Sequence, residues 1–343
     1  MAVSAATYFL WGDMKKNAAW GKEAKTMTFA NLAYIAIAEN YGKTISYEAG
    51  VLADRDPEEL HQMRVSMRHL RTALVGFAPV LSLPAIATEK TVGRVAKVLG
   101  KLRDIDVLEA TLKTEYRPQL PKAERQKLDR LLKRLAKDRK KAFKAVKKTL
   151  KGKTYLHLKK GFTSWLEKPH YSSLACLPME LILPDLLLPQ FSQLLLHSGW
   201  WVGVGAGGEI PSVQDSAPDT ICNILVQQEK KLHSLRKSAK RTRYQMELFE
   251  QFYGGEYETY LKQIKTVQSI LGDLQDSFVL KEFLNRFFAK SFQTKLPHLA
   301  QHLQEIRQQK WQAWQDLQQK FSCLETRQSF RAIAQSPHFV REE

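Results

Sequence analysis

The 343-residue chain carries 53 Lys and Arg against 35 Asp and Glu, which gives a formal net charge of +18. A hydrophobic fraction of 44% excludes an intrinsically disordered chain, and only 17 Gly and 13 Pro exclude a collagen-like or low-complexity one. Cys176, Cys222 and Cys323 are widely separated and in no metal-ligand spacing, which excludes a disulfide scaffold and predicts a reducing, cytoplasmic location. So large a positive charge predicts an anionic partner.

Apolar residues recur every three to four positions along most of the chain, and this periodicity predicts an all-α fold. In the first half we expect helices near 28–52, 57–81, 84–113, 121–150 and 155–166. In the second half we expect helices near 218–252, 257–288 and 296–334. The start of the second helix is clearly marked, because Asp56 is a good cap and Pro57 suits the first helical position.

One apolar stretch, 177–203, has nearly the composition of a membrane span. It also contains Glu180, Pro184, Asp185 and Pro189, which would place carboxylates and helix breaks inside a bilayer. We therefore predict a buried helical hairpin or cap in this stretch, and no membrane partner.

The most informative feature is an internal repeat. The segment 60–71, Leu-His-Gln-Met-Arg-Val-Ser-Met-Arg-His-Leu-Arg, returns 172 residues later as Leu-His-Ser-Leu-Arg-Lys-Ser-Ala-Lys-Arg-Thr-Arg. At the same offset, Leu-Gly-Lys-Leu-Arg-Asp at 99–104 returns as Leu-Gly-Asp-Leu-Gln-Asp. Two motifs that share one offset predict a tandem duplication of a helical unit. The predicted organisation is an N-terminal extension (1–21), a first helical half (22–169), a connecting segment (170–216) and a second helical half (217–343).

The basic residues of the repeated helix form one stripe. At 100° per residue, the first copy places four of them on a narrow arc that borders the apolar face. They are His61, Arg64, Arg68 and Arg71, and the second copy has His233, Arg236, Lys240 and Arg243. Cations beside a core lose hydration, which is costly unless an anion compensates them. Asp104 and Asp276 are too few to neutralise both stripes, so we expect the stripes to meet a bound anion in a shared groove.

The densest positive charge lies in 122–153, which holds fifteen Lys and Arg against three Asp and Glu. Its periodicity predicts an amphipathic helix whose basic face advances about 5 Å per turn. We call this face the lysine rail: Arg130, Lys133, Lys137, Lys140, Lys144, Lys147 and Lys151. A solvated surface is the alternative interpretation. Like charges four residues apart destabilise a helix, so the scarcity of Glu favours a bound polyanion.

These motifs resemble the CHAD domain (conserved histidine α-helical domain), in a cyanobacterial style, from about residue 22 onward. The matching patterns are Leu-His-x-x-Arg-Val-x-x-Arg-x-Leu-Arg, its weaker second copy, and the two Leu-Gly-x-Leu-x-Asp motifs. The resemblance implies two four-helix bundles related by a pseudo-twofold axis, with a basic central cavity that binds inorganic polyphosphate. Family members are often joined to a CYTH triphosphatase domain. Its Glu-x-Glu-x-Lys signature is missing from this sequence, so a stand-alone protein is expected.

The stripes, the rail and the resemblance together predict the polyphosphate-binding residues. They are His61, Arg64, Arg68, Arg71, Arg103, Arg130, Lys133, Lys137, Lys140, Lys141, Lys144, Lys148, His233, Arg236, Lys240, Arg243, Arg307 and Lys310. The last long helix is rich in Gln, so we expect asymmetric binding dominated by 61–71 and 130–151. The expected partners are polyphosphate, other phosphate-rich polyanions and polyphosphate-associated proteins, at polyphosphate granules. No cofactor is expected, and no oligomeric state follows from the sequence.

The residues also bear on three other functions: metal binding, catalysis and nucleic-acid binding. Metal binding by His61 and His233 is disfavoured, because each shares its face with three cations and lacks a Cys or carboxylate at ligand spacing. Catalysis is not expected, because the sequence has no nucleophile elbow, P-loop or zinc motif. Binding of RNA or another nucleic acid is the main alternative. Single-strand binders add aromatic platforms, a role for which Trp311 and Trp314 are available if they do not lie in the core.

Overall fold

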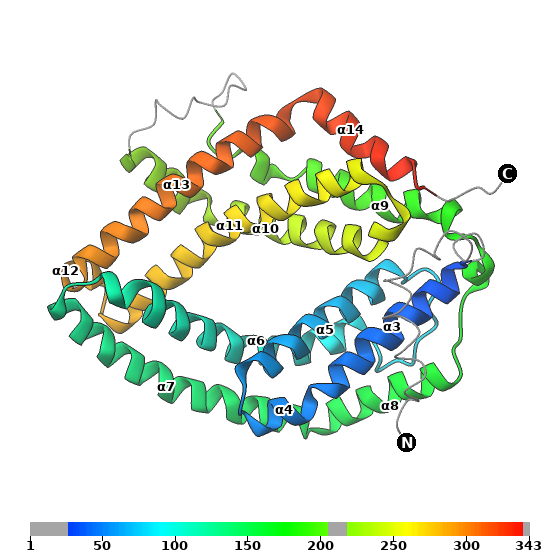
Figure 1. Cartoon of the computed structure of the whole chain (residues 1–343), viewed down its shortest axis with the longest axis horizontal. Coiled ribbons are helices and arrows are strands. Elements are labelled where there is room, and N and C mark those ends of the chain that lie inside the picture. The colour runs from blue at the N-terminus through cyan, green and yellow to red at the C-terminus, as the bar shows by residue number, and fades with distance from the viewer. Residues whose placement is uncertain (1–26, 205–217, 339–343) are drawn as a thin grey trace. The chain divides into compact units, whose positions relative to one another are not determined.

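The computed structural model describes residues 27–204 and 218–338. Within these ranges the secondary structure is helical, with two isolated β-bridges, Thr28–Pro178 and Leu81–Tyr171, and no strand (Figure 1). The all-α class predicted from the sequence is confirmed. The N-terminal extension predicted at 1–21 and residues 205–216 of the predicted connecting segment lie outside the described residues.

The described chain forms two compact units. The first contains the described residues up to Glu109 together with Arg134–Leu183, and the second contains Ala110–Lys133 together with the described part of Pro184–Pro337. This division does not follow chain order, because 110–133 packs with the later part of the chain. The boundaries predicted from the internal repeat stay a prediction.

The helices before residue 177 begin and end close to the predicted positions. They are α3 (Phe29–Ser46), α4 (Glu48–Ala53), α5 (Pro57–Gly76), α6 (Glu89–Thr111), the π-turn η2 (Leu112–Tyr116), η3 (Arg117–Gln119), α7 (Lys122–Leu150), α8 (Lys153–Glu167) and η4 (Ser173–Cys176). The predicted start of α5 is confirmed, since the Asp56 side chain accepts from the Glu58 amide at 2.8 Å and Pro57 follows it. The predicted start of α6 at 84 is wrong, because 84–88 folds into turns first.

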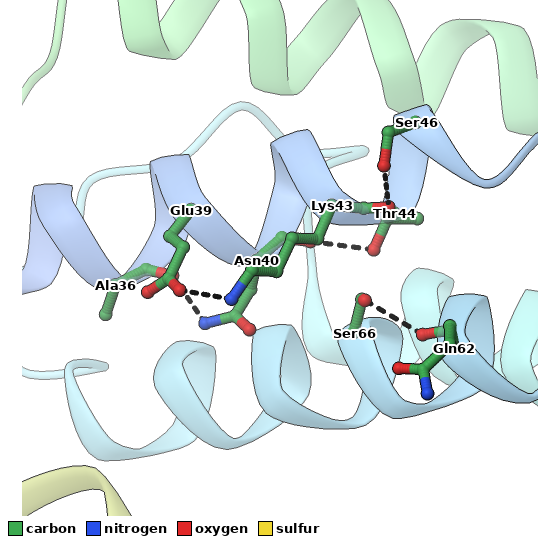
Figure 2. A network of polar contacts seen from close by, with 8 residues as sticks. All are labelled: Ala36, Glu39, Asn40, Lys43, Thr44, Ser46, Gln62 and Ser66. Carbon is green, nitrogen blue, oxygen red and sulfur yellow. Dashed lines mark hydrogen bonds and ion pairs between the residues drawn. The ribbon is translucent and has the colours of Figure 1, made fainter. Parts of the chain in front are cut away.

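Helices α3 and α5 pack side by side in the first unit (Figure 2). Three polar side chains are buried between apolar neighbours there, and each donates to a carbonyl of its own helix: Asn40 to Ala36, Thr44 to Asn40, and Ser66 to Gln62, at 2.8–2.9 Å. The buried polar groups on this side of α5 therefore need no partner across the interface. The basic stripe of α5 lies on a different side, toward α6.

The later helices are α9 (Met179–Leu195), η5 (Ser198–Trp201), α10 (Pro218–Phe249), η6 (Glu250–Phe252), α11 (Gly255–Phe287), α12 (Phe292–Lys295), α13 (Pro297–Ser322) and α14 (Leu324–Gln335). The pair α10 and α11 is the most extensive helix contact of the second unit (Figure 1). The predicted helix at 296–334 is two helices, because Cys323 takes an extended conformation between them. Trp311 and Trp314 are buried, and Trp314 stacks on Trp200 at 5.2 Å, so both belong to the core.

The apolar stretch at 177–203 forms α9 and η5. Leu183, Leu187 and Phe191 of α9 are fully buried, whereas Leu181 and Leu196 are exposed. Among the described residues, Met179–Trp201 is the one segment long and apolar enough to cross a membrane by length and composition alone. Two prolines lie inside α9, as the sequence shows.

Candidate anion-binding site

The stripe arginines of the first unit lie against glycines of the neighbouring helix. A Cβ atom built on Gly100 of α6 would lie 3.0 Å from Nη1 of Arg64, and one built on Gly93 would lie 3.2 Å from Cζ of Arg71. Arg64 and Arg71 are two turns apart on α5, and the two glycines are two turns apart on α6. Each of these arginines of α5 therefore lies over a glycine of α6, where no side chain displaces it.

The second unit repeats this contact. Gly272 of α11 lies beneath Arg236 of α10, and a Cβ atom there would be 3.2 Å from the arginine Nε. Both residues stand 172 positions after their counterparts, Arg64 and Gly100. The buried Nε of Arg236 makes no hydrogen bond within the described residues. Both glycines belong to the Leu-Gly-x-Leu-x-Asp motifs. The sequence alone does not show that an arginine of a neighbouring helix covers each of them.

Three stripe arginines of the described chain, Arg64, Arg71 and Arg243, lie near carboxylates. Arg243 Nε is 3.5 Å from Glu247 in a pair with about a fifth of its surface exposed, and the other two pairs are more exposed. Arg64 Nη1 lies 3.4 Å from Asp104 Oδ1, which is a long contact to a carboxylate whose side chain is 76% exposed. Arg71 donates through Nε to Glu89 at 2.7 Å. Exposed pairs of this kind contribute about 0–1 kcal/mol each, so a ligand with denser negative charge can replace the carboxylate.

The two repeated histidines lie in similar surroundings. Burial, followed by the charge of Arg103, lowers the pKa of His61. Arg68 and Arg64 lower it further by smaller amounts, and Glu58 raises it. Burial, followed by Lys237 and Arg236, lowers the pKa of His233. Both imidazoles are consequently neutral at pH 7, where each can donate or accept one hydrogen bond.

Helix α7 displays the lysine rail. All seven members of the rail are exposed, as are Lys141 and Lys148 beside it. Within the described residues, none of these nine side chains forms an ion pair with a carboxylate. The opposite face of α7 is buried through leucines and Val146. The rail is thus a row of exposed cations on a helix whose apolar face is buried. Within the described chain its members form no ion pair, although the charge of Lys133 acts on Asp129.

One basic residue of α7 has a structural role instead. Arg139 donates to both oxygens of Asp54, at 2.8 and 2.7 Å, and through Nε to Asp106 at 2.8 Å. The hydrogen bonds to Asp54 raise the pKa of Arg139. Burial raises the pKa of Asp106, although the charge of Arg139 acts in the opposite direction.

The predicted binding residues of the later helices differ in environment. Arg307 is buried, with 7% of its surface exposed, and donates to the hydroxyl and carbonyl of Ser277 at 3.0 and 3.1 Å. Lys310 is paired with Asp273 at 2.7 Å. These contacts do not favour Arg307 as a surface ligand. Lys240 and Arg243 are half-buried, and the Arg243 guanidinium lies 4.3 Å from the centre of the Tyr244 ring.

The structure brings His61, Arg64, Arg68 and Arg103 together in the first unit, because the charges of all three arginines act on His61. It brings His233 and Arg236 together in the second unit. The meeting of both stripes in one groove stays a prediction. Among the residues described, no group of three or more His, Cys, Asp or Glu is placed to hold a metal ion.

The fold and these helices define an all-α protein that displays rows of cationic side chains. The family model of the CHAD domain matches residues 35–285, and the chain therefore belongs to the CHAD family. That family is associated in general with the binding of polyphosphate and triphosphate groups. The chain is also similar to the crystal structure of the CHAD domain from the plant Ricinus communis, with a TM-score of 0.55, 21% identity, and coverage of 92% of this chain and 94% of that one. No curated protein matches the sequence.

Proposed function

We propose that this protein is a non-catalytic module that binds inorganic polyphosphate through the stripes of α5 and α10 and the lysine rail of α7. The observation that carries the proposal is the rail, whose seven exposed cations, like Lys141 and Lys148 beside it, form no ion pair with a carboxylate in the described chain. A linear polyanion supplies closely spaced charges to such a row and releases counter-ions when it binds. The arginines of the stripes supply planar donors that suit phosphate oxygens.

RNA remains the second candidate, and the aromatic residues favour polyphosphate over it. Trp311 and Trp314 are buried, so neither can stack on a base. Phe143, on α7, is half-buried and lies beneath Lys147 at 4.4 Å. Single-strand binders use exposed aromatic rings beside their basic groove, whereas polyphosphate has no bases to stack.

A competition at matched salt tests the proposal. The protein is mixed with labelled long-chain polyphosphate, and unlabelled polyphosphate or single-stranded RNA of equal phosphate content is added. We expect polyphosphate to displace the label at much lower concentration than RNA, and binding to weaken steeply as salt rises. Equal or stronger displacement by RNA would identify a nucleic-acid binder instead. We place this function in the cytoplasm, at polyphosphate granules. The three unpaired cysteines, two of them exposed, favour a reducing compartment.

A further inference from the structure

Two helix-interior glycines of this protein stand where alanine would make a more stable helix. Glycine is the least favourable residue inside a helix apart from proline, because it loses the most backbone freedom. Gly100 lies in the middle of α6, and Gly272 lies at the matching position of α11. The same costly choice at both copies of a repeat requires a reason other than chance.

Packing against a neighbouring backbone or core side chain is not that reason. The three heavy atoms nearest to a Cβ on Gly100 all belong to Arg64, at 3.0, 3.6 and 3.8 Å. Those nearest to a Cβ on Gly272 all belong to Arg236, at 3.2, 3.4 and 3.8 Å. By contrast, a Cβ on Gly161 would first meet Ile86 at 2.8 Å, as expected for a glycine that lets two elements pack closely.

We propose that Gly100 and Gly272 are positioning residues of the polyphosphate site, which let the guanidinium groups of Arg64 and Arg236 lie close against α6 and α11. This inference rests on the proposed function. Because neither glycine has a Cβ, the guanidinium of each arginine occupies space that a Cβ would crowd, at 3.0 Å for Arg64 and 3.2 Å for Arg236, and this close packing restricts its movement. An arginine fixed in this way loses less side-chain entropy when phosphate binds. Its charge is also less screened than that of an arginine extended into solvent.

The remaining contacts of the two arginines leave them able to accept a ligand. Among residues 27–204 and 218–338, the acidic contact of Arg64 is the long one to the exposed Asp104. The Nε of Arg236 is buried and makes no hydrogen bond in the described part of the chain. Each glycine thus lowers the stability of its helix and keeps an arginine ready for an anion.

The test uses Gly100→Ala, Gly272→Ala and both together in the full chain, with long-chain polyphosphate as the ligand. The alanine displaces only the far end of a flexible arginine, so we expect the melting temperature to stay or rise. Because the guanidinium is pushed off the helix, we expect polyphosphate affinity to fall by about tenfold per substitution, as for the loss of one charged hydrogen bond. Gly255→Ala is the matched control, since a Cβ there meets nothing within 4 Å. It should leave affinity unchanged.

A double-substitution cycle separates positioning from a general effect. In an Arg64→Ala background, Gly100→Ala should cause no further loss of affinity, because the arginine through which it acts is gone. If the unmodified protein fails to bind polyphosphate, the proposed function is wrong. If the unmodified protein binds, three outcomes overturn the positioning role. In the first, the alanine variants bind equally well, and in the second, Gly100→Ala and Arg64→Ala lose affinity additively. The third outcome is a melting temperature that falls in proportion to the loss of binding.

Discussion

Arg139 donates to both carboxylate oxygens of Asp54 through the two terminal nitrogens of its guanidinium, at 2.8 and 2.7 Å, and so joins α7 to the end of α4. Only about a quarter of either side chain is exposed, which makes this pair better shielded than the surface pairs of the same helix. The residue lies within the most basic segment of the chain, yet its contacts are structural.

We therefore expect Arg139→Gln to reduce stability without reducing polyphosphate binding. Loss of a partly buried bidentate pair should lower the free energy of unfolding by about 1–3 kcal/mol. Chemical denaturation measures this loss, and polyphosphate titration measures binding. Arg134→Gln is the control, because Arg134 forms an exposed pair with Asp138 one turn away and should change stability little. A large loss of binding in Arg139→Gln with normal stability would place this arginine in the ligand site instead.

Charge reversal at Arg64, Arg68 and Lys137 together should abolish polyphosphate binding and leave helicity intact. Lys137 is exposed, and Arg64 and Arg68 are half-buried outside the apolar core, so we expect the helices to form with Glu at these positions. Circular dichroism and a binding titration measure the two effects.

The matched control reverses the charge of three exposed residues outside the stripes and the rail: Lys262, Arg286 and Lys290. It changes the net charge equally, and we expect it to weaken binding only slightly. Equal weakening by both triple variants would show that binding follows net charge and needs neither the stripe nor the rail.

The two histidines predict how polyphosphate binding varies with pH. Their pKa values are lowered from 6.5, mainly by burial, so both are neutral in the free protein at pH 7. A bound polyanion favours the protonated form, and affinity should therefore rise as the pH falls below about 6.5. Titrations between pH 7.5 and 5.5 measure the change, and the His61→Gln, His233→Gln double variant should lose most of it.

The same pKa shift makes the stability of the free protein fall as the pH falls, whereas the affinity for polyphosphate rises. The unfolded chain takes up protons at these histidines before the folded chain does. The contribution of the neutral histidines to stability is complete above pH 6.5 and declines as the pH falls through the lowered pKa of the folded state. Melting temperature without ligand should drop in that range, and the drop should be smaller in the double variant. A pH-independent affinity in the wild type would contradict a ligand role for the histidines.

The start of α13 is expected to depend on Glu124, which lies in the first turn of α7. Its buried carboxylate accepts from Nδ1 of His298 at 2.6 Å and from the backbone amides of His298 and Leu299 at 3.2 and 3.4 Å, and so caps the start of α13. Glu124→Ala should cost about 1–2 kcal/mol, the value of a lost helix cap. Hydrogen exchange should accelerate in the first turn of α13 and around 122–127. Glu115→Ala, at an exposed site, is the control.

The sequence predicted those features that depend on neighbours along one helix. The start at Pro57, the amphipathic α7 and the exposure of the rail follow from periodicity and capping alone. What it could not predict depends on a second helix. Arg139 and Lys140 are adjacent and equally basic in the sequence, and only the position of Asp54 makes the first structural. Arg307 is among the predicted polyphosphate-binding residues, but it is buried and donates to the hydroxyl and carbonyl of Ser277.

Helix α7 begins in one compact unit and ends in the other. A break of the chain anywhere in 184–204 would therefore leave the later fragment without the segment Ala110–Lys133, on which its α13 depends for the Glu124 cap. The earlier fragment would carry that segment with nothing to pack against. Two such pieces, produced in one cell, should therefore fold only as a pair.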